Sequence, residues 1–416
     1  MDAAQVSSIA RWVTQAGLSG MAEPDLLHGF CSRLVEAGLP LTRGNMVIDT
    51  LHPVYEGRAF RWRCDPAEID PVISYGRTNE GEAAANWQRS TYYHLLSTGE
   101  DALRRRIGPE HPADFSVLED LRLERQTDYL ALVHRFGAEG TIGEMDCVYS
   151  SWTTDAPLGF SDAQLALLRE LTLPLALAMK CASLARIAET LVTTYLGRDA
   201  GRRVLSGRIA RGVTDRIQAV LWFSDLRGFT RITDTASPEQ IIPFLNDYAE
   251  AIISSIHQAG GDVLKLIGDG ALAIFNANSL GEACRCALKA EALMRAQISG
   301  LNEDRLSRGV PIAEAYLGLH IGEVFYGNIG SQERLDFTVV GPAVNEVSRI
   351  AALCHSVERE VLISSAFFSA ASANDQADLV SVGRYALRGV SRAQELFTLD
   401  PGTVGHGGAP QSMPSP

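Results

Sequence analysis

The sequence has few of the features that mark a secreted, membrane-spanning or nucleic-acid-binding protein. Its start, MDAAQVSSIARWVTQAGL, lacks the basic segment and apolar core of a signal peptide. The longest apolar stretch, Leu171–Met179, is bounded by Glu170 and Lys180 and is too short to cross a bilayer. A formal net charge of -13 excludes a general binder of nucleic acid or anionic membranes. We therefore expect a cytoplasmic protein with no membrane span and no nucleic-acid partner.

Cysteine patterns of known use are also missing. The seven cysteines are odd in number and irregularly spaced, which favours a reducing compartment over a disulfide framework. Cys284 and Cys286 lack the second pair of ligands that a zinc site needs, so we expect them to pack within a helix. The histidines of the N-terminal part likewise lack ligand spacing, and we expect no haem or metal there.

What the sequence does contain is enough apolar material for two cores. With 416 residues, 46% of them hydrophobic and 21% charged, the chain exceeds one ordinary domain. We predict an α/β domain at 1–180, a helical linker at 181–211, a second domain at 212–400 and a disordered tail at 401–416. The tail is predicted from its Gly, Pro and Ser content and its lack of apolar periodicity.

The end of the first domain has a recognisable order of elements. Residues 140–154 alternate as in a strand, and after G-F-S-D the stretch 159–192 indicates a long apolar helix with Ser161 as its N-cap. This order resembles the end of a GAF-type sensor domain. The resemblance implies either a ligand-sensing pocket or a structural, dimerising module, and the sequence favours neither.

The same helix leads into a basic, glycine-punctuated connector at 194–212. A long helix with an apolar stripe between two domains is typical of a parallel dimerising stalk. The alternative interpretation is that the helix packs only against its own domain.

From Asp215 the pattern changes. A strand over 215–230 ends in a turn, a helix covers 238–261, and apolar runs on both sides of Gly268 predict a hairpin over 261–275. A helix at 280–299 then precedes a strand at 315–330. The order strand, helix, strand, strand, helix, strand indicates an α+β sandwich with one helical layer.

Two acids in this second domain suit a metal site. Asp225 closes the apolar run V-L-W-F-S-D, and Asp269 lies at the hairpin tip between two glycines. Neighbouring antiparallel strands would bring the two carboxylates to one end of the sheet, where oxygen ligands suit Mg²⁺ or Mn²⁺. A metal pair is what an in-line attack on phosphorus needs. For Asp269 taken alone, a simple turn is the stronger interpretation, because Asp-Gly favours turns.

Asn345 and Arg349 form a second candidate group. Gly341-Pro342 opens a helix, and two residues four positions apart project from one helical face. An arginine beside an amide donor suits the charge that develops on a transferring phosphate. Taken alone, an exposed arginine that pairs with Glu346 or another acid is the simpler interpretation.

Together these motifs resemble one family. F-S-D-L-R-G-F-T, K-L-I-G-D-G, H-I-G-E-V-F-Y-G-N-I-G and D-F-T-V-V-G-P-A-V-N-E-V-S-R, in this order, closely resemble the class III adenylate cyclase homology domain, over residues 215–398. The resemblance implies a ferredoxin-like α/β sandwich, ATP as substrate and two Mg²⁺ or Mn²⁺ ions per active site. The fold expected for the chain is thus α+β, with a class III cyclase domain joined by a helical stalk to an N-terminal α/β GAF-like domain.

The resemblance also implies roles for individual residues. Asp225 and Asp269 match the metal-binding aspartates, and Asn345 and Arg349 match the pair that orients ribose and stabilises the transition state. Substrate contacts are further implied for Lys265 at the adenine ring, for Arg388 at the terminal phosphates, where the family usually has lysine, and for the main-chain amides of Phe229 and Thr230 at phosphate.

Thr338 departs from the common pattern of the family. Many members have an aspartate at this position as the second adenine-reading group, and a threonine hydroxyl can still accept a hydrogen bond from the adenine amino group. A threonine here resembles the subclass that often responds to bicarbonate, so bicarbonate or another small molecule is an expected regulator. Lys265 and Thr338 differ from the Glu and Cys typical of guanylate cyclases, which favours ATP over GTP.

The expected function is adenylate cyclase activity, which converts ATP to 3′,5′-cyclic AMP and pyrophosphate. The family shares each active site between two protomers, so we expect a homodimer that is regulated by its N-terminal domain. Three alternatives stay open: a guanylate or promiscuous cyclase, a catalytically silent nucleotide-binding sensor, and a protein whose N-terminal half dominates as a ligand-gated dimerisation switch.

Overall fold

The computed structural model describes residues 1–65, 70–137, 141–143, 145–388, 390 and 393–400. The chain divides into two units, Met1–Leu191 and Val192–Pro416, and the division falls within one long helix. The tail predicted as disordered, 401–416, lies outside the described residues.

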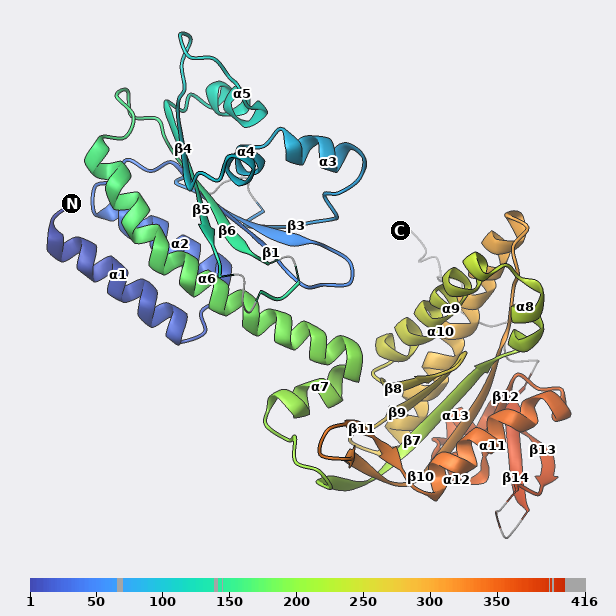
Figure 1. Cartoon of the computed structure of the whole chain (residues 1–416). Helices are drawn as coiled ribbons and strands as arrows, with labels where there is room; N and C mark the ends of the chain where they lie inside the picture. Colours follow the sequence, from blue (N-terminus) through green and yellow to red (C-terminus); the bar gives the residue numbers. More distant parts are fainter. Residues whose placement is uncertain (66–69, 138–140, 144, 389, 391–392, 401–416) are drawn as a thin grey trace, which may run out of the picture. The chain divides into compact units, whose positions relative to one another are not determined.

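The first unit is built on an antiparallel sheet, which has six strands among the described residues, in the order β3-β2-β1-β6-β5-β4. Helices α1, α2 and α6 cover one face of this sheet, and α3, α4 and α5 cover the other (Figure 1). The strands are β1 (Arg43–Asp49), β2 (Gly57–Arg63), β3 (Val72–Tyr75), β4 (Ala102–Arg106), β5 (Asp128–Arg135) and β6 (Cys147–Thr154), and the helices are α1 (Ala3–Leu18), α2 (Glu23–Glu36), α3 (Gly81–Gln88), α4 (Thr91–Thr98), α5 (Ser116–Leu123) and α6 (Asp162–Leu196).

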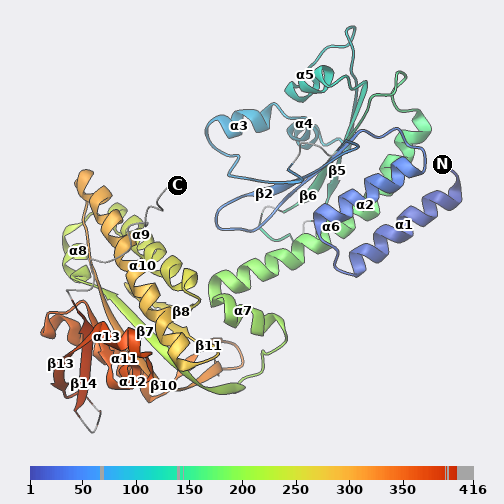
Figure 2. The ribbon, with the colours of Figure 1, turned by 180° about the vertical axis from the view of Figure 1, so that it is seen from behind.

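Helix α6 begins where the sequence predicts. The Ser161 Oγ accepts a hydrogen bond from the Gln164 amide at 3.3 Å, and the Gln164 side chain accepts one from the Ser161 amide at 2.8 Å. Between Leu165 and Ile187 the buried side chains of α6 join the core formed with α1, α2 and the sheet, and Figure 2 shows the three helices together from behind. In a single chain the helix therefore packs against its own unit, which is the alternative interpretation. The dimerising stalk and the GAF-like identity of this unit stay predictions.

Helix α6 is more apolar over its length than the short run Leu171–Met179 suggests. Among the described residues, α6 is the one helix long and apolar enough to cross a membrane, with an 18-residue window of mean hydropathy 1.4. That window is 44% buried within the structure. Burial of this kind is also found in core helices of proteins that do not cross membranes.

The second unit contains the predicted order of strands and helices. Its sheet has the path β13-β14-β12-β10-β7-β9-β8 in the described part of the chain, and β11 pairs with β10. The succession β7, α9, β8, β9, α10, β10 is the βαββαβ unit of ferredoxin-like folds, as predicted. The strands are β7 (Thr214–Leu226), β8 (Asp262–Ile267), β9 (Gly270–Phe275), β10 (Ala315–Gly330), β11 (Leu335–Val340), β12 (Val361–Ser364), β13 (Leu379–Tyr385) and β14 (Gln394–Leu399), and the helices are α7 (Arg198–Leu205), α8 (Phe229–Thr235), α9 (Pro238–Gln258), α10 (Leu280–Ser307), α11 (Pro342–Val357), α12 (Ser365–Ala370) and α13 (Ala373–Ala377).

The prediction of a single helical layer is wrong. Helices α9 and α10 pack on one face of the sheet, in a core around Trp222, Phe244 and Met294. Helix α11 packs on the other face with α7, in a core around Leu221, Tyr326 and Val347. Because side chains alternate along a strand, Leu221 and Trp222 can serve opposite faces. The apolar pattern of these strands does not show which helices cover each face of the sheet, so the second helical layer becomes visible only in the structure.

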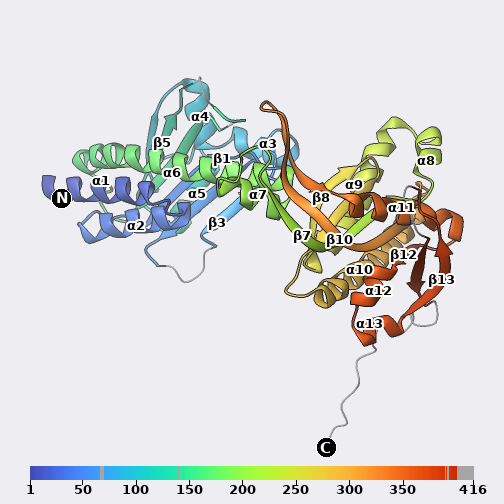
Figure 3. The same cartoon turned by 90° about the horizontal axis from the view of Figure 1, so that it is seen from below.

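Two glycines on β10 bring α11 close to the sheet, and the two elements lie side by side in Figure 1 and Figure 3. A Cβ added to Gly318 would lie 2.6 Å from the Val347 carbonyl oxygen. A Cβ added to Gly322 would lie 2.3 Å from the Ala343 Cβ. Both distances are shorter than van der Waals contact, so only glycine allows the helix this approach.

Candidate active site

Asp225 stands at the end of the central strand β7. The buried residues Val220, Leu221 and Trp222 anchor this strand in the core, whereas Asp225 is exposed. The register with β10 pairs Asp225 with Tyr316. The strand therefore delivers a carboxylate to an open end of the sheet from a rigid base.

Asp269 lies in the turn of the predicted hairpin. The pairing of Ile267 with Gly270 leaves Gly268 and Asp269 as the two turn residues, and Gly268 has a φ of 63°. The Asp269 Oδ2 accepts a hydrogen bond from the amide of Leu226 at 3.3 Å. The turn thus holds Asp269 beside the end of β7, where Asp225 lies.

The two carboxylates affect one another's ionisation. Asp225 is exposed at the end of the strand, yet the surrounding protein removes part of its water; this loss of hydration, followed by the negative charge of Asp269 and a hydrogen bond with it, raises the pKa of Asp225 to about 6. In the described part of the chain, neither aspartate forms an ion pair with a lysine, arginine or histidine. Two adjacent carboxylates without a cationic side chain are stabilised in the ionised form by a bound cation.

The surroundings of the pair fit a divalent metal ion. A Cβ added to Gly270 would lie 2.5 Å from the Ser224 carbonyl oxygen and 3.4 Å from both the Asp225 Oδ1 and the Ile267 carbonyl oxygen. Carboxylate and carbonyl oxygens are the donors that hard divalent cations prefer. No group of three or more His, Cys, Asp or Glu suited to a metal occurs in the described residues, so two carboxylates are the acidic ligands on offer.

Lys265, the predicted adenine contact, has an unpredicted partner. Its ammonium donates a hydrogen bond to the carboxylate of Asp336 on β11, and both side chains are partly exposed. Asp336 and Thr338 are two residues apart on one strand and share one face of it. Sequence reasoning missed Asp336 because it sought the carboxylate at position 338. The signal was present as the D-x-T spacing in L-D-F-T.

Asn345 and Arg349 lie on α11, as predicted, with Asn345 exposed and Arg349 half-buried. The alternative interpretation, an exposed Arg349 paired with Glu346 or another acid, does not hold among the described residues, where Arg349 forms no ion pair. Glu346 instead accepts a hydrogen bond from Gln394 at 2.8 Å and lies 3.7 Å from His320. Both predicted functional side chains are therefore free of competing partners in this part of the structure.

The predicted phosphate contacts come from two further places. Phe229 and Thr230 begin α8, and their amides belong to the first turn, where helical N–H groups lack partners within the helix. Arg388 is exposed in a turn after β13. The phosphate roles of all three residues stay predictions.

The structure brings only some of the predicted residues together within one chain. Asp225 and Asp269 are neighbours, and Lys265 is on the strand that leads to Asp269. Across the described residues, no hydrogen bond or ion pair joins the aspartates to Asn345, Arg349 or Thr338. One chain thus presents separate groups of candidate residues.

Comparison with known proteins places the family match in the second unit. Residues 214–400 match the family model described as adenylate and guanylate cyclase catalytic domain. The chain is 34% identical over 157 residues to the adenylate cyclase of Anabaena cylindrica, in a match covering 37% of this chain and 30% of that protein. It is 27% identical over 219 residues to adenylate cyclase 1 of Rhizobium meliloti (strain 1021), covering 51% and 32%. The matches thus span about a third of the length of these relatives.

Solved structures with similar folds carry both substrate names. The adenylyl cyclase CyaB from P. aeruginosa is 24% identical with a TM-score of 0.41, covering 45% of this chain and 96% of that one. The guanylyl cyclase Cya2 is 27% identical with a TM-score of 0.40, covering 45% and 95%.

Proposed function

We propose that this chain, whose residues 214–400 form a class III adenylate/guanylate cyclase catalytic domain, converts ATP to 3′,5′-cyclic AMP and pyrophosphate. The observation that carries the proposal is the pairing of Asp225 and Asp269 at one end of the sheet. A carboxylate pair suits a triphosphate that binds together with divalent cations. The adenylate cyclase names of the two bacterial relatives support ATP as the substrate.

The reaction forms one bond and breaks one bond at the α-phosphorus. The ribose 3′ oxygen attacks this atom, the bond to the bridging oxygen of pyrophosphate breaks, and the 3′ proton leaves to solvent or substrate. Bound at Asp225 and Asp269, a pair of Mg²⁺ or Mn²⁺ ions would lower the pKa of the 3′ hydroxyl and offset the developing negative charge. Asn345 orients the ribose, and Arg349 stabilises the charge on the transferring phosphate.

Base recognition is assigned to Lys265, Thr338 and Asp336. The ammonium of Lys265 has three donors, one of which is used by Asp336. Asp336 thereby limits the directions that the Lys265 side chain can take, and we assign it as a positioning residue for this lysine. Thr338 accepts a hydrogen bond from the adenine amino group. Arg388 and the amides of Phe229 and Thr230 hold the phosphates.

The active unit is proposed to be a homodimer. The groups of candidate residues do not contact one another within one chain, so a second copy would supply the missing half of each site. Exposed apolar side chains near these groups support an interface: Leu266 is 53% exposed, Ile267 46% and Phe325 46%. Side chains of this kind are commonly covered in a self-complementary, two-fold contact.

Regulation by the first unit and a cytoplasmic location complete the proposal. The GAF-like resemblance supports a sensor role for the first unit, and Thr338 is the sole motivation for a bicarbonate response. The alternative with the most direct support is a guanylate cyclase, because the family model that matches residues 214–400 covers both adenylate and guanylate cyclases.

The decisive experiment is a cyclase assay on the purified full chain. ATP and GTP at equal concentration are each supplied with Mg²⁺ or Mn²⁺, with and without bicarbonate, and with chloride as the ionic-strength control. Cyclic AMP as the main product supports the proposal. Mainly cyclic GMP supports the alternative, and no product with tight nucleotide binding supports a silent sensor.

A further inference from the structure

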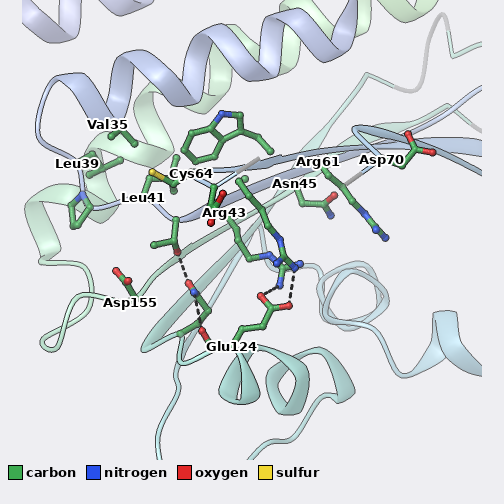
Figure 4. Close-up of a pocket in the computed structure, with 17 residues that line it drawn as sticks. Val35, Leu39, Leu41, Arg43, Asn45, Arg61, Cys64, Asp70, Glu124 and Asp155 are labelled. Atoms are coloured by element: carbon green, nitrogen blue, oxygen red, sulfur yellow. Dashed lines mark hydrogen bonds and ion pairs between the residues drawn. The ribbon is translucent and has the colours of Figure 1, made fainter. Parts of the chain in front are cut away.

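A cavity in the first unit has an unusual arrangement of charges. Its volume is about 1160 Å³, and it lies where β1 begins and β2 ends, beside the last residues of α2 and α5. Figure 4 shows Arg43 and Arg61 among the residues that line this cavity, with Glu124 beside Arg43 and the Arg61 side chain pointing away from Glu124. The cavity lies entirely within the first unit and is separate from the proposed catalytic residues.

Three arginines share one face of two neighbouring strands. The register pairs Arg43 of β1 with Arg63 of β2, and it pairs Asn45 with Arg61. Residues two apart on a strand point to the same side, so all three guanidiniums belong to one surface. Like charges directly opposite one another destabilise a strand pair unless an anion lies between them.

One internal carboxylate supplies part of that negative charge. Glu124 lies just after α5, and its two oxygens are each 2.7 Å from a guanidinium nitrogen, one of Arg43 and one of Arg63. The Arg61 guanidinium makes no hydrogen bond or ion pair with any of the described residues. Although Arg61 is exposed to the cavity, partial loss of water and the charges of Arg43 and Arg63 lower its pKa, and the charge of Asp70 only partly opposes this. Glu124 thus pairs directly with Arg43 and Arg63, and Arg61 is left without a directly bound carboxylate.

The polar groups around the arginines define the rest of a ligand. The Asn45 Oδ1 is buried and has no partner in the described structure, while its Nδ2 donates to the Tyr92 hydroxyl at 3.2 Å. An unpartnered buried acceptor is satisfied by a hydrogen-bond donor. Three further carboxylates line the cavity without pairing with these arginines within the described residues, and they limit the charge of a ligand: Asp65, Asp70 and Asp155.

We propose that this cavity binds a small organic anion with one or two negative charges and a neighbouring hydroxyl or ammonium group. The acid group binds Arg61 and takes over part of the contacts that Glu124 makes with Arg43 and Arg63. The neighbouring donor bonds to the Asn45 Oδ1. Planar guanidiniums suit both carboxylate and phosphate groups, so either can supply the charge. Binding of the anion does not depend on the proposed cyclase activity. Only an effect of the bound anion on the cyclase rate would rest on the proposed function.

The test measures binding to the full chain by calorimetry and by thermal unfolding. Malate and glycerol 3-phosphate are the two probes, and glycerol and chloride at matched ionic strength are the controls. Stabilisation by malate alone identifies a carboxylate site, and stabilisation by glycerol 3-phosphate alone identifies a phosphate site. If neither anion binds at up to tens of millimolar, the proposal is wrong. Because calorimetry needs no turnover, this result is independent of whether the chain is a cyclase.

Variants of the cavity separate ligand binding from a structural role. Arg61→Gln removes a side chain without partners, so the chain should fold while the affinity falls by about tenfold or more. Arg61→Lys should give an intermediate affinity, and Arg11→Gln, an exposed arginine on α1, should leave it unchanged. Glu124→Gln should tighten binding several-fold, because it removes the competing anion. Weaker binding in Glu124→Gln, or equal losses in Arg61→Gln and Arg11→Gln, would overturn the proposal.

Discussion

At the residue scale, Asp225 and Asp269 depend on each other in a way that a lone carboxylate does not. Their proximity opposes ionisation of Asp225 until a cation is bound. Loss of a residue that only supports a metal ligand costs about 10–100-fold in activity. Asp225 and Asp269 are proposed as the ligands themselves, so Asp225→Asn or Asp269→Asn should cost more and lower kcat/KM by more than about 100-fold. Turnover measured across a metal titration checks this expectation.

The matched control for these variants is Asp234→Asn. Asp234 is exposed on α8 in the same unit and should leave turnover unchanged. Full activity in Asp225→Asn would refute the proposed metal role of the aspartate pair. Asp269 would then be interpreted as a turn residue only.

Asp336 is expected to act through Lys265. Charge-assisted hydrogen bonds are among the stronger ones in proteins, so Asp336→Asn should raise KM for ATP by about tenfold with a smaller change in kcat. The ratio of ATP to GTP turnover should fall at the same time, and Asp336→Glu should restore part of it. Steady-state kinetics with both nucleotides provide the measurement.

A double-mutant cycle tests whether the two residues form one unit. If Asp336 only positions Lys265, then Asp336→Asn should have little further effect once Lys265 is replaced by alanine. Independent, additive effects would show that Asp336 has a separate role.

At the element scale, the sequence was a good guide where periodicity and glycine placement agree. The strand at 315–330, the hairpin around Gly268 and the helix after Gly341 all occur as predicted. The helix predicted at 280–299 continues through Gly300 to Ser307, because Ile298 and Leu301 on either side of that glycine pack in the core around Trp222.

What the sequence could not provide were contacts between distant elements. The position of α11 on the second face of the sheet depends on Gly318 and Gly322, whose role appears only when the helix is beside them. The pairing of Lys265 with Asp336 joins residues 71 positions apart on two strands that are not sequential. Local patterns specify elements, whereas such pairings follow from how the elements pack.

The glycines of β10 give a test of this packing. Gly318→Val should destabilise the second unit by about 1–3 kcal/mol through overpacking and should also reduce activity, because α11 carries Asn345 and Arg349. Gly300→Ala on α10 is the control: a Cβ there meets nothing within 4 Å. That control should stabilise the chain by up to about 1 kcal/mol. Urea unfolding together with cyclase assays would measure both effects, and unchanged stability in Gly318→Val would contradict the packing account.

A buried ion pair joins α2 to α6 in the first unit. Glu23 is 1% exposed and lies 2.7 Å from Arg186 and 3.5 Å from Arg58. Burial opposes ionisation of Glu23, but the hydrogen bond and charge of Arg186, with the charge of Arg58, outweigh it and lower the pKa of Glu23. The stabilisation is therefore complete above the pKa of a free glutamate, about 4.3, and is lost as the pH falls through the lower folded-state value.

Glu23→Gln should accordingly destabilise the first unit in a pH-dependent way. Breaking a buried pair costs about 3–5 kcal/mol, and we expect about 2 kcal/mol at neutral pH because Arg186 is 38% exposed. The difference from the unmodified chain should shrink as the solution becomes more acidic. Denaturant unfolding at several pH values, with Glu36→Gln as the exposed control on α2, checks both the size and the sign.

At the scale of the whole molecule, two units of different character share one continuous helix. The family match is confined to the second unit, and the arginine-lined cavity is confined to the first. Helix α6 spans the division, so it is the covalent route by which an event in the first unit could reach the second. Immediately after it, α7 is fixed to the start of β7 by an ion pair of Arg203 with Asp215 at 2.7 Å. Since Asp225 lies one residue before the end of β7, this strand connects α7 to a candidate metal ligand.

In the proposed homodimer, two inactive variants should complement each other, because each active site takes residues from both protomers. Asp225→Ala and Arg349→Ala should each be inactive alone, since every site in such a dimer lacks one essential group. In a mixed dimer, one site combines both defects while the other has the intact aspartates of one protomer and the intact arginine of its partner. Random exchange gives half mixed dimers with one working site in two, so activity should recover to about one quarter of the unmodified level. Recovery should also depend on protein concentration. If mixing restores nothing while subunit exchange is demonstrated, each chain holds its own site and the shared-site proposal is wrong.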